Sequence, residues 1–372
     1  MTREQACAKI EEAISQMDYQ GTPVEYYRYG NGHINDTFVV VCRLNNNATV
    51  KYLLQRINHE VFKNPEQLMS NIVSITSFLR GKIIKNGGDP ERETLNIVPL
   101  RDGRSYYKDS IGSYWRSYLF IDNTVSYDLV NRAEDFYLSA FAFGNFQRLL
   151  SDYPAHTLYE TIKDFHNTPV RFENLKRAID TDICGRVKNV QKEIEFALAR
   201  ESEVGILLEK QKKGELPLRV THNDTKLNNI LFDKNTNKPL CIIDLDTIMP
   251  GLSVYDFGDS IRFGATTGAE DEKDLSKVNF SLELYEAYVK GFIEGTEGSL
   301  TDNEIDMLPM GAKLMTYECG IRFLTDYLEG DIYFRIHRED HNLDRCRTQF
   351  KLVSDMEEKF DIMHEIVNKY RP

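Results

Sequence analysis

Short hydrophobic segments separated by turn residues in the first third of the chain predict a small antiparallel sheet. Asp-Gly and Asn-Gly turns separate the segments. The predicted strands are 24–29, 37–43, 50–57, 96–100, 104–108 and 113–121. Hydrophobic residues at helical spacing predict helices at 4–17 and 64–79, the second with Asn64 as its cap and Pro65 in its first turn. The first third is therefore a β-rich lobe with two helices.

Beyond residue 122 the spacing of hydrophobic residues becomes helical. The predicted helices are 131–150, 171–182, 185–213, 274–294, 302–328 and 347–367. One hydrophobic strand, 240–243, stands among them. We therefore predict an α+β chain with two lobes: residues 1–121 form a small antiparallel β lobe, and residues 122–372 form a larger, mainly helical lobe.

Composition limits the classes of protein that fit. The chain has 372 residues, of which 41% are hydrophobic and 28% are charged, and this composition suits a globular protein. Its formal net charge of −12 argues against a nucleic-acid surface, because phosphate backbones require a basic patch.

The cysteines and the N-terminus bear on the compartment. The six cysteines have no metal-like spacing, and we expect them to be small buried hydrophobic residues in a reducing compartment. The first residues lack the hydrophobic core of a signal peptide, and no segment approaches the ~20 apolar residues of a membrane span. We therefore expect a cytoplasmic protein without a membrane partner, with a monomer as the working expectation.

The polar residues that follow Val220 carry the clearest chemical signal. Asp224 and Asn229 have the spacing of the kinase catalytic loop, H-R-D-x-x-x-x-N, and Lys226 stands two positions after the aspartate. Asp244 follows the predicted strand 240–243, where a second metal ligand of this template is expected. The set predicts phosphoryl transfer: Asp224 acts as catalytic base, Lys226 contacts the transferred phosphate, and Asn229 and Asp244 bind Mg²⁺.

An alternative for each of these residues is an ordinary solvated loop, because Asn-Asp-Thr turns are common. The complete set of His222, Asp224, Lys226, Asn229 and Asp244 is much harder to obtain by chance.

The segments Thr-His-Asn-Asp-Thr-Lys-Leu-Asn-Asn-Ile-Leu and Ile-Ile-Asp-Leu-Asp-Thr-Ile-Met-Pro-Gly also carry a family resemblance. They resemble the signature of the aminoglycoside phosphotransferase-like small-molecule kinases, and within these the N-acetylhexosamine kinases. The resemblance runs from about Gly30 nearly to the C-terminus. It implies a bilobal protein-kinase-like fold, ATP as phosphoryl donor, Mg²⁺, and the anomeric hydroxyl of an N-acetylhexosamine as acceptor.

Asp256-Phe257-Gly258 matches the metal-binding tripeptide of protein kinases. Asp244 lies 20 positions after Asp224 (244 minus 224), a span that one hairpin fills, whereas Asp256 lies 32 positions after it (256 minus 224). In the resembling family the later aspartate is a structural anchor. We therefore predict that Asp244 is the metal ligand.

The remaining nucleotide contacts are expected in the first lobe. Gly30 and Gly32 lie in a predicted hairpin turn whose amides could cover phosphates, although an ordinary turn is the alternative. On the third strand Gln55 occupies the place of the phosphate-binding lysine, and it brings no charge. The resemblance implies that Phe120 to Asp122 form the hinge that holds adenine.

Glu318, Arg322, Asp326 and Glu329 recur at helical spacing in the helix predicted at 302–328 and just beyond it. A solvated charged face is one interpretation. The other is a polar wall that binds a sugar. The resemblance places sugar contacts on Arg322, Tyr333 and His33, with the acceptor hydroxyl at Asp224. His156 and His166 show no partner pattern and are expected to be structural.

Two alternatives stay open at this point. A kinase of the same fold could act on another small alcohol, such as an aminoglycoside, choline or another sugar. A pseudokinase that only binds ligands would explain Gln55, but it would be expected to lack Asp224, Asn229 or Asp244, and the sequence retains all three.

Overall fold

The computed structural model describes residues 3–30, 34–130 and 132–372. The chain divides into two compact units. Unit 1 comprises Met1–Val125 together with Leu231–Ile248, and unit 2 comprises Ser126–Ile230 together with Met249–Pro372.

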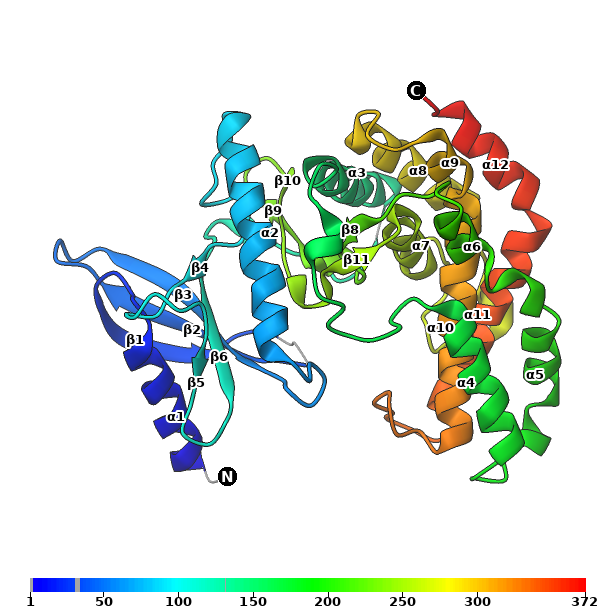
Figure 1. Cartoon of the computed structure of the whole chain (residues 1–372), viewed down its shortest axis with the longest axis horizontal. Helices are drawn as coiled ribbons and strands as arrows, with labels where there is room; N and C mark the ends of the chain where they lie inside the picture. The colour runs from blue at the N-terminus through cyan, green and yellow to red at the C-terminus, as the bar shows by residue number, and fades with distance from the viewer. Residues whose placement is uncertain (1–2, 31–33, 131) are drawn as a thin grey trace. The chain divides into compact units, whose positions relative to one another are not determined.

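Unit 1 is built on an antiparallel sheet, coloured blue to cyan in Figure 1. Its strand order is β1-β2-β3-β6-β4, and β5 also pairs with β6. The strands are β1 (Thr22–Arg28), β2 (Asp36–Arg43), β3 (Thr49–Ile57), β4 (Ile97–Val98), β5 (Tyr107–Lys108) and β6 (Tyr114–Leu119). The register places Gln55 of β3 directly opposite Arg116 of β6.

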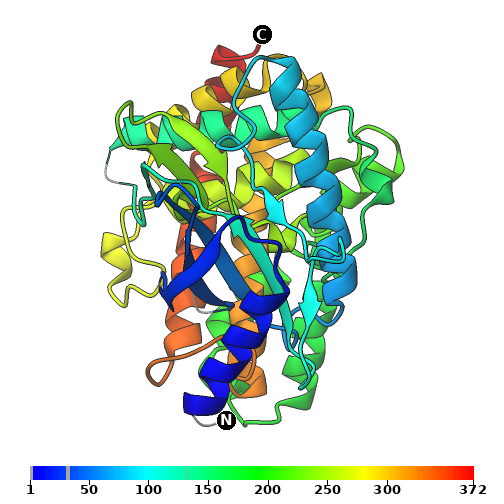
Figure 2. The same cartoon turned by 90° about the vertical axis from the view of Figure 1, so that its left-hand side faces the viewer.

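Two helices accompany this sheet, α1 (Arg3–Gln16) and α2 (Pro65–Lys85) (Figures 1 and 2). Ile10, Ala13 and Ile14 of α1 are buried in one core with residues of β2, β3 and β6, because the hydrophobic residues of an amphipathic helix share one face. Helix α2 begins as the sequence predicts, since the Asn64 side chain accepts a hydrogen bond from the Gln67 N–H at 3.2 Å.

A second, three-stranded sheet belongs largely to unit 1. It has the order β10-β9-β7, with β7 (Thr124–Val125), β9 (Ile230–Asp233) and β10 (Pro239–Ile242). The 3₁₀ turn η5 (Leu245–Thr247) follows β10, and Asp244 precedes it in the left-handed conformation (φ +59°). Because Leu245 and Asp246 are buried, this turn is held inside the unit.

Unit 2 is mainly helical, and α10 contacts α4, α7 and α11. Helix α3 runs along α8, with which it makes an extensive contact. The helices are α3 (Ala133–Leu149), α4 (Thr168–Thr181), α5 (Gln191–Leu198), α6 (Ile206–Lys212), α7 (Ser253–Gly264), α8 (Leu282–Thr296), α9 (Asp302–Asp306), α10 (Leu308–Glu329), α11 (His341–Glu358) and α12 (Phe360–Lys369). Two short strands, β8 (Arg219–Thr221) and β11 (Met249–Gly251), form an antiparallel pair.

Two glycines set the close approach of α7 to α10. A Cβ atom on Gly258 would lie 2.3 Å from the carbonyl oxygen of Gly311, and one on Gly311 would lie 2.7 Å from the carbonyl oxygen of Val254. Because no other residue lacks Cβ, these positions require glycine unless the helices move apart. This contact fixes the position of α7. The helix carries the residues that form hydrogen bonds with the candidate catalytic loop.

Three segments that the sequence predicts as single helices are each divided into two helices in the structure. The segment predicted as one helix at 185–213 contains α5 and α6 with 3₁₀ turns beside them, and α6 begins after Gly205. The segment predicted at 302–328 is divided into α9 and α10, because Pro309 has no N–H for a continuous helix and stands at the start of α10. The predicted C-terminal helix is two helices, α11 and α12.

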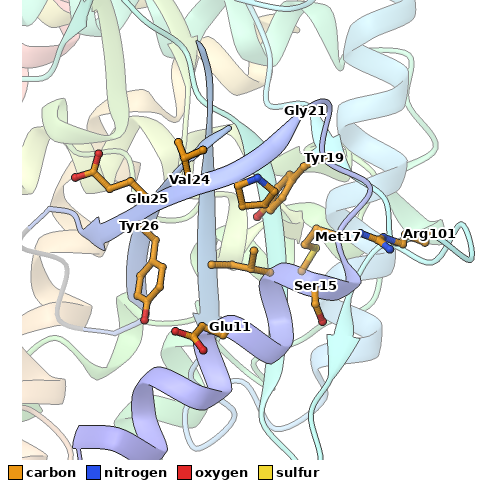
Figure 3. A pocket seen from close by; sticks show the side chains of 11 residues that line it. Glu11, Ser15, Met17, Tyr19, Gly21, Val24, Glu25, Tyr26 and Arg101 are labelled. Carbon is orange, nitrogen blue, oxygen red and sulfur yellow. The ribbon is translucent and has the colours of Figure 1, made fainter. Parts of the chain in front are cut away.

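A hollow of about 620 Å³ lies between α1 and β1 in unit 1 (Figure 3). Figure 3 shows Glu11 and Tyr26 facing it from the helix and the strand. None of its lining residues is among the predicted site residues. The six cysteines are free thiols; the predicted burial holds for Cys42, Cys241 and Cys346 but is wrong for Cys184, which is exposed. None of the described helices is long and hydrophobic enough to span a bilayer.

Candidate catalytic and nucleotide-binding site

The candidate catalytic loop follows β8 in unit 2. Strand β8 pairs with β11, and the packing is tight: a Cβ atom on Gly251 would lie 2.4 Å from Thr221 Oγ1. The chain then turns at Asn223, which has φ +66°. Asparagine tolerates the left-handed region better than most residues, so this turn is consistent with the local sequence. His222 is fully buried beside the rings of Phe143 and Phe146.

Asp224, Lys226 and Asn229 converge in this loop. Lys226 Nζ lies 2.7 Å from Asp224 Oδ1, and Asn229 Nδ2 donates to Asp224 Oδ2 at 3.1 Å. Asn229 Nδ2 also donates to the main-chain oxygen of Asp224 at 2.8 Å. The Asp224 side chain keeps 30% of its surface exposed, so an acceptor hydroxyl can reach it.

The pKa of Lys226 is raised. Burial by itself lowers it, but the Asp224 carboxylate outweighs burial because it stabilises the ammonium. Lys226 therefore stays cationic at neutral pH, next to the carboxylate that the sequence predicts as the base.

The carboxylate of Asp256 anchors the loop through hydrogen bonds to its backbone. This carboxylate accepts the backbone N–H groups of His222 at 2.9 Å and Asn223 at 2.8 Å, and Gln147 Nε2 donates to it at 2.6 Å. Asp256 is fully buried within α7, so the Asp-Phe-Gly tripeptide is helical here. The predicted role of Asp256 as a structural anchor is confirmed.

Asp259 and Ser260 lie three and four positions after Asp256, on the same face of α7. Asp259 Oδ2 accepts the Thr225 N–H at 3.0 Å, and Ser260 Oγ donates to the Thr225 carbonyl at 2.7 Å. One helical face thus holds three residues of the loop, His222, Asn223 and Thr225, on both sides of Asp224.

The two carboxylates of this face have pKa shifts of opposite sign. Burial raises the pKa of Asp256, whose neighbouring donors only partly compensate for the loss of water. Burial also acts to raise the pKa of Asp259, but the Arg262 guanidinium and other cationic neighbours outweigh it, and the pKa is lowered. Asp259 is therefore a fixed negative charge beneath the loop.

The chemistry of the ligand atoms suits Mg²⁺. Both bonds of the Asn229 amide nitrogen are directed to Asp224, which leaves its amide oxygen as the ligand atom. Asp244, in unit 1, is exposed and offers a carboxylate at the end of β10. Amide and carboxylate oxygens are the hard ligands that Mg²⁺ prefers, so these residue types fit the ion.

The predicted nucleotide residues of unit 1 that are described lie on or beside the main sheet. Gly30 has φ +73° after β1, and Phe120 and Asp122 follow β6. Lys51 Nζ lies 2.8 Å from Asp122 Oδ1 and 5.4 Å from the centre of the Phe120 ring. Gly32 and His33 lie outside the described residues.

Gln55 is engaged with neighbouring side chains. Its Nε2 donates to Thr37 Oγ1 at 3.1 Å, and its Oε1 accepts from Arg116 Nε at 3.0 Å. A guanidinium group, that of Arg116 on the adjacent strand, therefore contacts the side chain at the expected lysine position. Sequence reasoning missed Arg116, because the pairing of β3 with β6 is not apparent from local periodicity.

The predicted sugar residues are arranged around α10 in unit 2. The Arg322 guanidinium lies 5.3 to 5.9 Å from the ring centres of Phe165, Tyr333 and Phe334, within cation–π range. Asp326 accepts the backbone N–H groups of Tyr333 at 2.7 Å and Phe334 at 2.9 Å, which fixes the turn that carries these rings.

Burial excludes one interpretation of α10. Glu318 and Asp326 are 1% and 3% exposed, so a solvated charged face is wrong for both. Glu318 Oε2 accepts a hydrogen bond from Thr168 Oγ1 at 2.7 Å, and His166 Nδ1 lies 2.9 Å from Glu318 Oε1. Burial acts to raise the pKa of Glu318, but the facing His166 outweighs it and the pKa is lowered. Sequence reasoning left His166 without a partner because 152 positions separate the two residues.

A comparison with protein families gives a match for residues 112–289 to the phosphotransferase enzyme family. The match covers slightly less than half of the chain. The matched segment contains Asp224, Lys226, Asn229 and Asp244, whereas Gly30, Gln55, Arg322 and Tyr333 lie outside it. The phosphotransferase match thus covers the predicted catalytic and metal residues.

Solved structures of phosphotransferases share the fold over nearly the whole chain. An aminoglycoside phosphotransferase from Alicyclobacillus acidocaldarius has a TM-score of 0.62 at 10% identity, with 96% of each chain covered. A microcompartment-associated aminopropanol kinase has a TM-score of 0.57 at 14% identity, with 96% of this chain and 98% of that chain covered. The amicoumacin kinase hAmiN, solved in complex with AMP-PNP, Ca²⁺ and Ami, has a TM-score of 0.56 at 13% identity, with 96% of this chain and 94% of that chain covered. The predicted aminoglycoside phosphotransferase-like fold is confirmed.

Proposed function

We propose that the chain is an ATP- and Mg²⁺-dependent kinase that phosphorylates the anomeric hydroxyl of an N-acetylhexosamine. The observation that carries the proposal is the convergence of Lys226 and Asn229 on the two carboxylate oxygens of Asp224, on a loop inside the phosphotransferase segment. In this assignment residues 1–121 are the nucleotide-binding lobe, and residues 122–372 are the catalytic and sugar-binding lobe.

Each residue of the loop has a role in the proposed reaction. The anomeric oxygen attacks the γ-phosphorus of ATP while Asp224 takes the proton of the hydroxyl. The bond from the γ-phosphorus to the β,γ-bridging oxygen breaks, and ADP leaves with that electron pair. Lys226 faces the transferred phosphoryl group, and Mg²⁺, when bound by Asn229 and Asp244, neutralises charge on the phosphates.

The groups around Arg322 suit a sugar as acceptor. Burial lowers the pKa of Arg171 and the nearby Arg322 guanidinium lowers it further, while Glu318 and Asp164 act in the opposite direction, so charges of both signs lie there. A sugar offers hydroxyl groups to a planar guanidinium and an apolar ring face to Tyr333 and the neighbouring aromatic residues.

The test is ADP release from Mg·ATP with a panel of acceptors: N-acetylglucosamine, N-acetylgalactosamine, glucose, choline, ethanolamine and an aminoglycoside. We expect turnover with the N-acetylhexosamines, and phosphorus NMR should place the phosphate on C1. A phosphate on a primary carbon, or turnover only with an amine, would refute the proposed acceptor. Asp224→Asn should abolish turnover while the nucleotide still binds, and turnover that survives this change would refute the assigned base.

A further inference from the structure

Protein kinases place a lysine–carboxylate pair between the third strand and the following helix, and the described strand β3 and helix α2 do not form such a pair. Strand β3 has Gln55 at the lysine position, and α2 contains a single carboxylate, Glu66, in its first turn. Glu66 interacts with Tyr106 there. Unit 1 must therefore order its phosphate-binding segments with other residues.

A buried ion pair lies one strand away. Arg116 of β6 is 1% exposed and Asp246 of η5 is 3% exposed, and Arg116 Nη1 lies 2.5 Å from Asp246 Oδ1. The two atoms are outside hydrogen-bond geometry, and neither has another hydrogen-bond partner among the described residues. Gln55 orients the guanidinium through Nε. A buried pair of this kind is a costly way to stabilise a fold, because hydrophobic residues of similar volume often do as well.

The same carboxylate also reaches the segment that follows the predicted glycine turn. Asn35 Nδ2 donates to Asp246 Oδ2 at 2.6 Å, and Asn35 Oδ1 accepts the Asn58 N–H at 2.9 Å. Asp246 therefore links β6, the residues before β2 and the end of β3 in one network.

Helix α2 also holds the turn that contains Asp246. Asn71 of α2 is buried, and its Nδ2 donates to the Ile248 carbonyl at 3.0 Å. Asp244, two positions before Asp246, adopts φ +59° and ψ +57°. In this left-handed region the backbone of a residue other than glycine is strained, so the surrounding structure must hold it there. The fixed positions of Asp246 and Ile248 provide that constraint.

We propose that the Arg116–Asp246 pair replaces the lysine–carboxylate pair of protein kinases, and that it positions Asp244 and the segment at Asn35 for a metal–nucleotide complex. The inference rests on the proposed function. Because both side chains are buried, they act through these neighbours and do not contact the nucleotide themselves.

The experiment uses the double variant Arg116→Met with Asp246→Asn, which removes both charges and keeps an acceptor for Asn35. Neutral replacement of both partners of a buried pair is expected to leave the free energy of unfolding close to that of the wild type, whereas either single variant leaves a buried charge alone. Urea unfolding measures this free energy. The binding of a fluorescent ATP analogue, with and without Mg²⁺, measures the positioning.

We expect the double variant to fold like the wild type but to bind the Mg²⁺ complex at least about tenfold more weakly, equivalent to about 1.4 kcal/mol. Its affinity for the metal-free analogue should change by less than about twofold, because the lost contribution acts through the metal ligand. Arg56→Met is the matched control: it removes the pair with Asp36 from the neighbouring residue of β3 and should leave both affinities unchanged.

Wild-type affinity for the Mg²⁺ complex in the double variant would overturn the inference and leave the proposed function intact. If the wild-type protein itself binds no Mg·ATP, the proposed function fails and the inference fails with it. If the double variant does not fold, Asn35→Ala decides, because it removes the side chain that joins Asp246 to the segment before β2 and to the Asn58 N–H, and leaves the buried pair in place. A threefold or larger loss of Mg·ATP affinity supports the inference, and an unchanged affinity overturns it.

Discussion

The carboxylate of Asp256 accepts the backbone N–H of Asn223 at 2.8 Å, at the residue where the candidate catalytic loop turns through φ +66°. A buried aspartate on one helix thus determines the conformation of a loop 33 positions earlier. The tripeptide that resembles a metal-binding motif orders the loop without offering its carboxylate to a metal, since that carboxylate is enclosed by three donors.

The first prediction concerns this anchor. Asp256→Asn places an amide where the N–H groups of His222 and Asn223 require an acceptor, so one buried donor loses its partner. We expect the free energy of unfolding to fall by about 1–3 kcal/mol, and turnover to fall with it. Urea unfolding measures the change, and Asp361→Asn on the exposed start of α12 is the control. Equal stability of the variant and the wild type would contradict the anchoring role.

The second prediction concerns Lys226. Lys226→Met removes the cation that lies 2.7 Å from Asp224, while its methylene packing is largely kept. We expect kcat to fall by about 10²–10³, because charge that develops on the transferred phosphoryl group loses its stabilisation. The affinity for nucleotide, measured by titration calorimetry, should change far less. A variant whose kcat matches the wild type would rule out contact with the phosphoryl group.

The third prediction concerns acceptor binding. Arg322→Lys keeps the charge but loses the planar group that lies among Phe165, Tyr333 and Phe334. We expect the KM for the sugar to rise about tenfold with little change in kcat, because the interaction contributes to binding and not to the reaction step. Arg177→Lys, on the exposed side of α4, is the control. A fall in kcat at constant KM would contradict this assignment.

The fourth prediction concerns pH and the N-terminal helix. A hydrogen bond from Lys9 and a second from Tyr107 lower the pKa of Glu12 to about 2. Because the folded value lies below the unfolded value, Glu12 contributes stability above pH ~4.5 and loses that contribution as the pH falls toward 2. Glu12→Gln should therefore cost about 1 kcal/mol at pH 7 and progressively less in acid.

Denaturant unfolding of the wild type and the Glu12→Gln variant at pH 7 and at pH 3 measures this difference. A difference that stays constant between the two pH values would show that Glu12 acts without its charge.

The elements that the sequence predicted best are those whose signal is local. The Asn64 cap and the hydrophobic face of α2 lie within one helix, and the strands β1 to β3 are short hydrophobic segments bounded by turns. The division of 302–328 at Pro309 was equally local, and it was missed because the period of hydrophobic residues continues across the break.

Interactions between distant segments escaped prediction. Glu318 and Asp326 have the spacing of a solvated helix face. In the fold, His166 contacts Glu318 and the backbone of residues 333 and 334 donates to Asp326, so both carboxylates have buried partners. Arg116 gave no signal either, because a strand arginine is ordinarily half exposed, and its partner Asp246 lies 130 positions away (246 minus 116).

The sequence by itself determined the residue types that phosphoryl transfer requires. A carboxylate, a lysine and an amide at fixed spacing can be recognised from the order of residues alone, because their chemistry does not depend on the fold. It also determined the helix and strand periods from which the two kinds of lobe follow. Only the tertiary structure decided which charges are buried, because burial depends on the elements that pack around a side chain. It therefore decided that the Asp256 carboxylate holds the loop and that Arg116 of β6 is buried against Asp246.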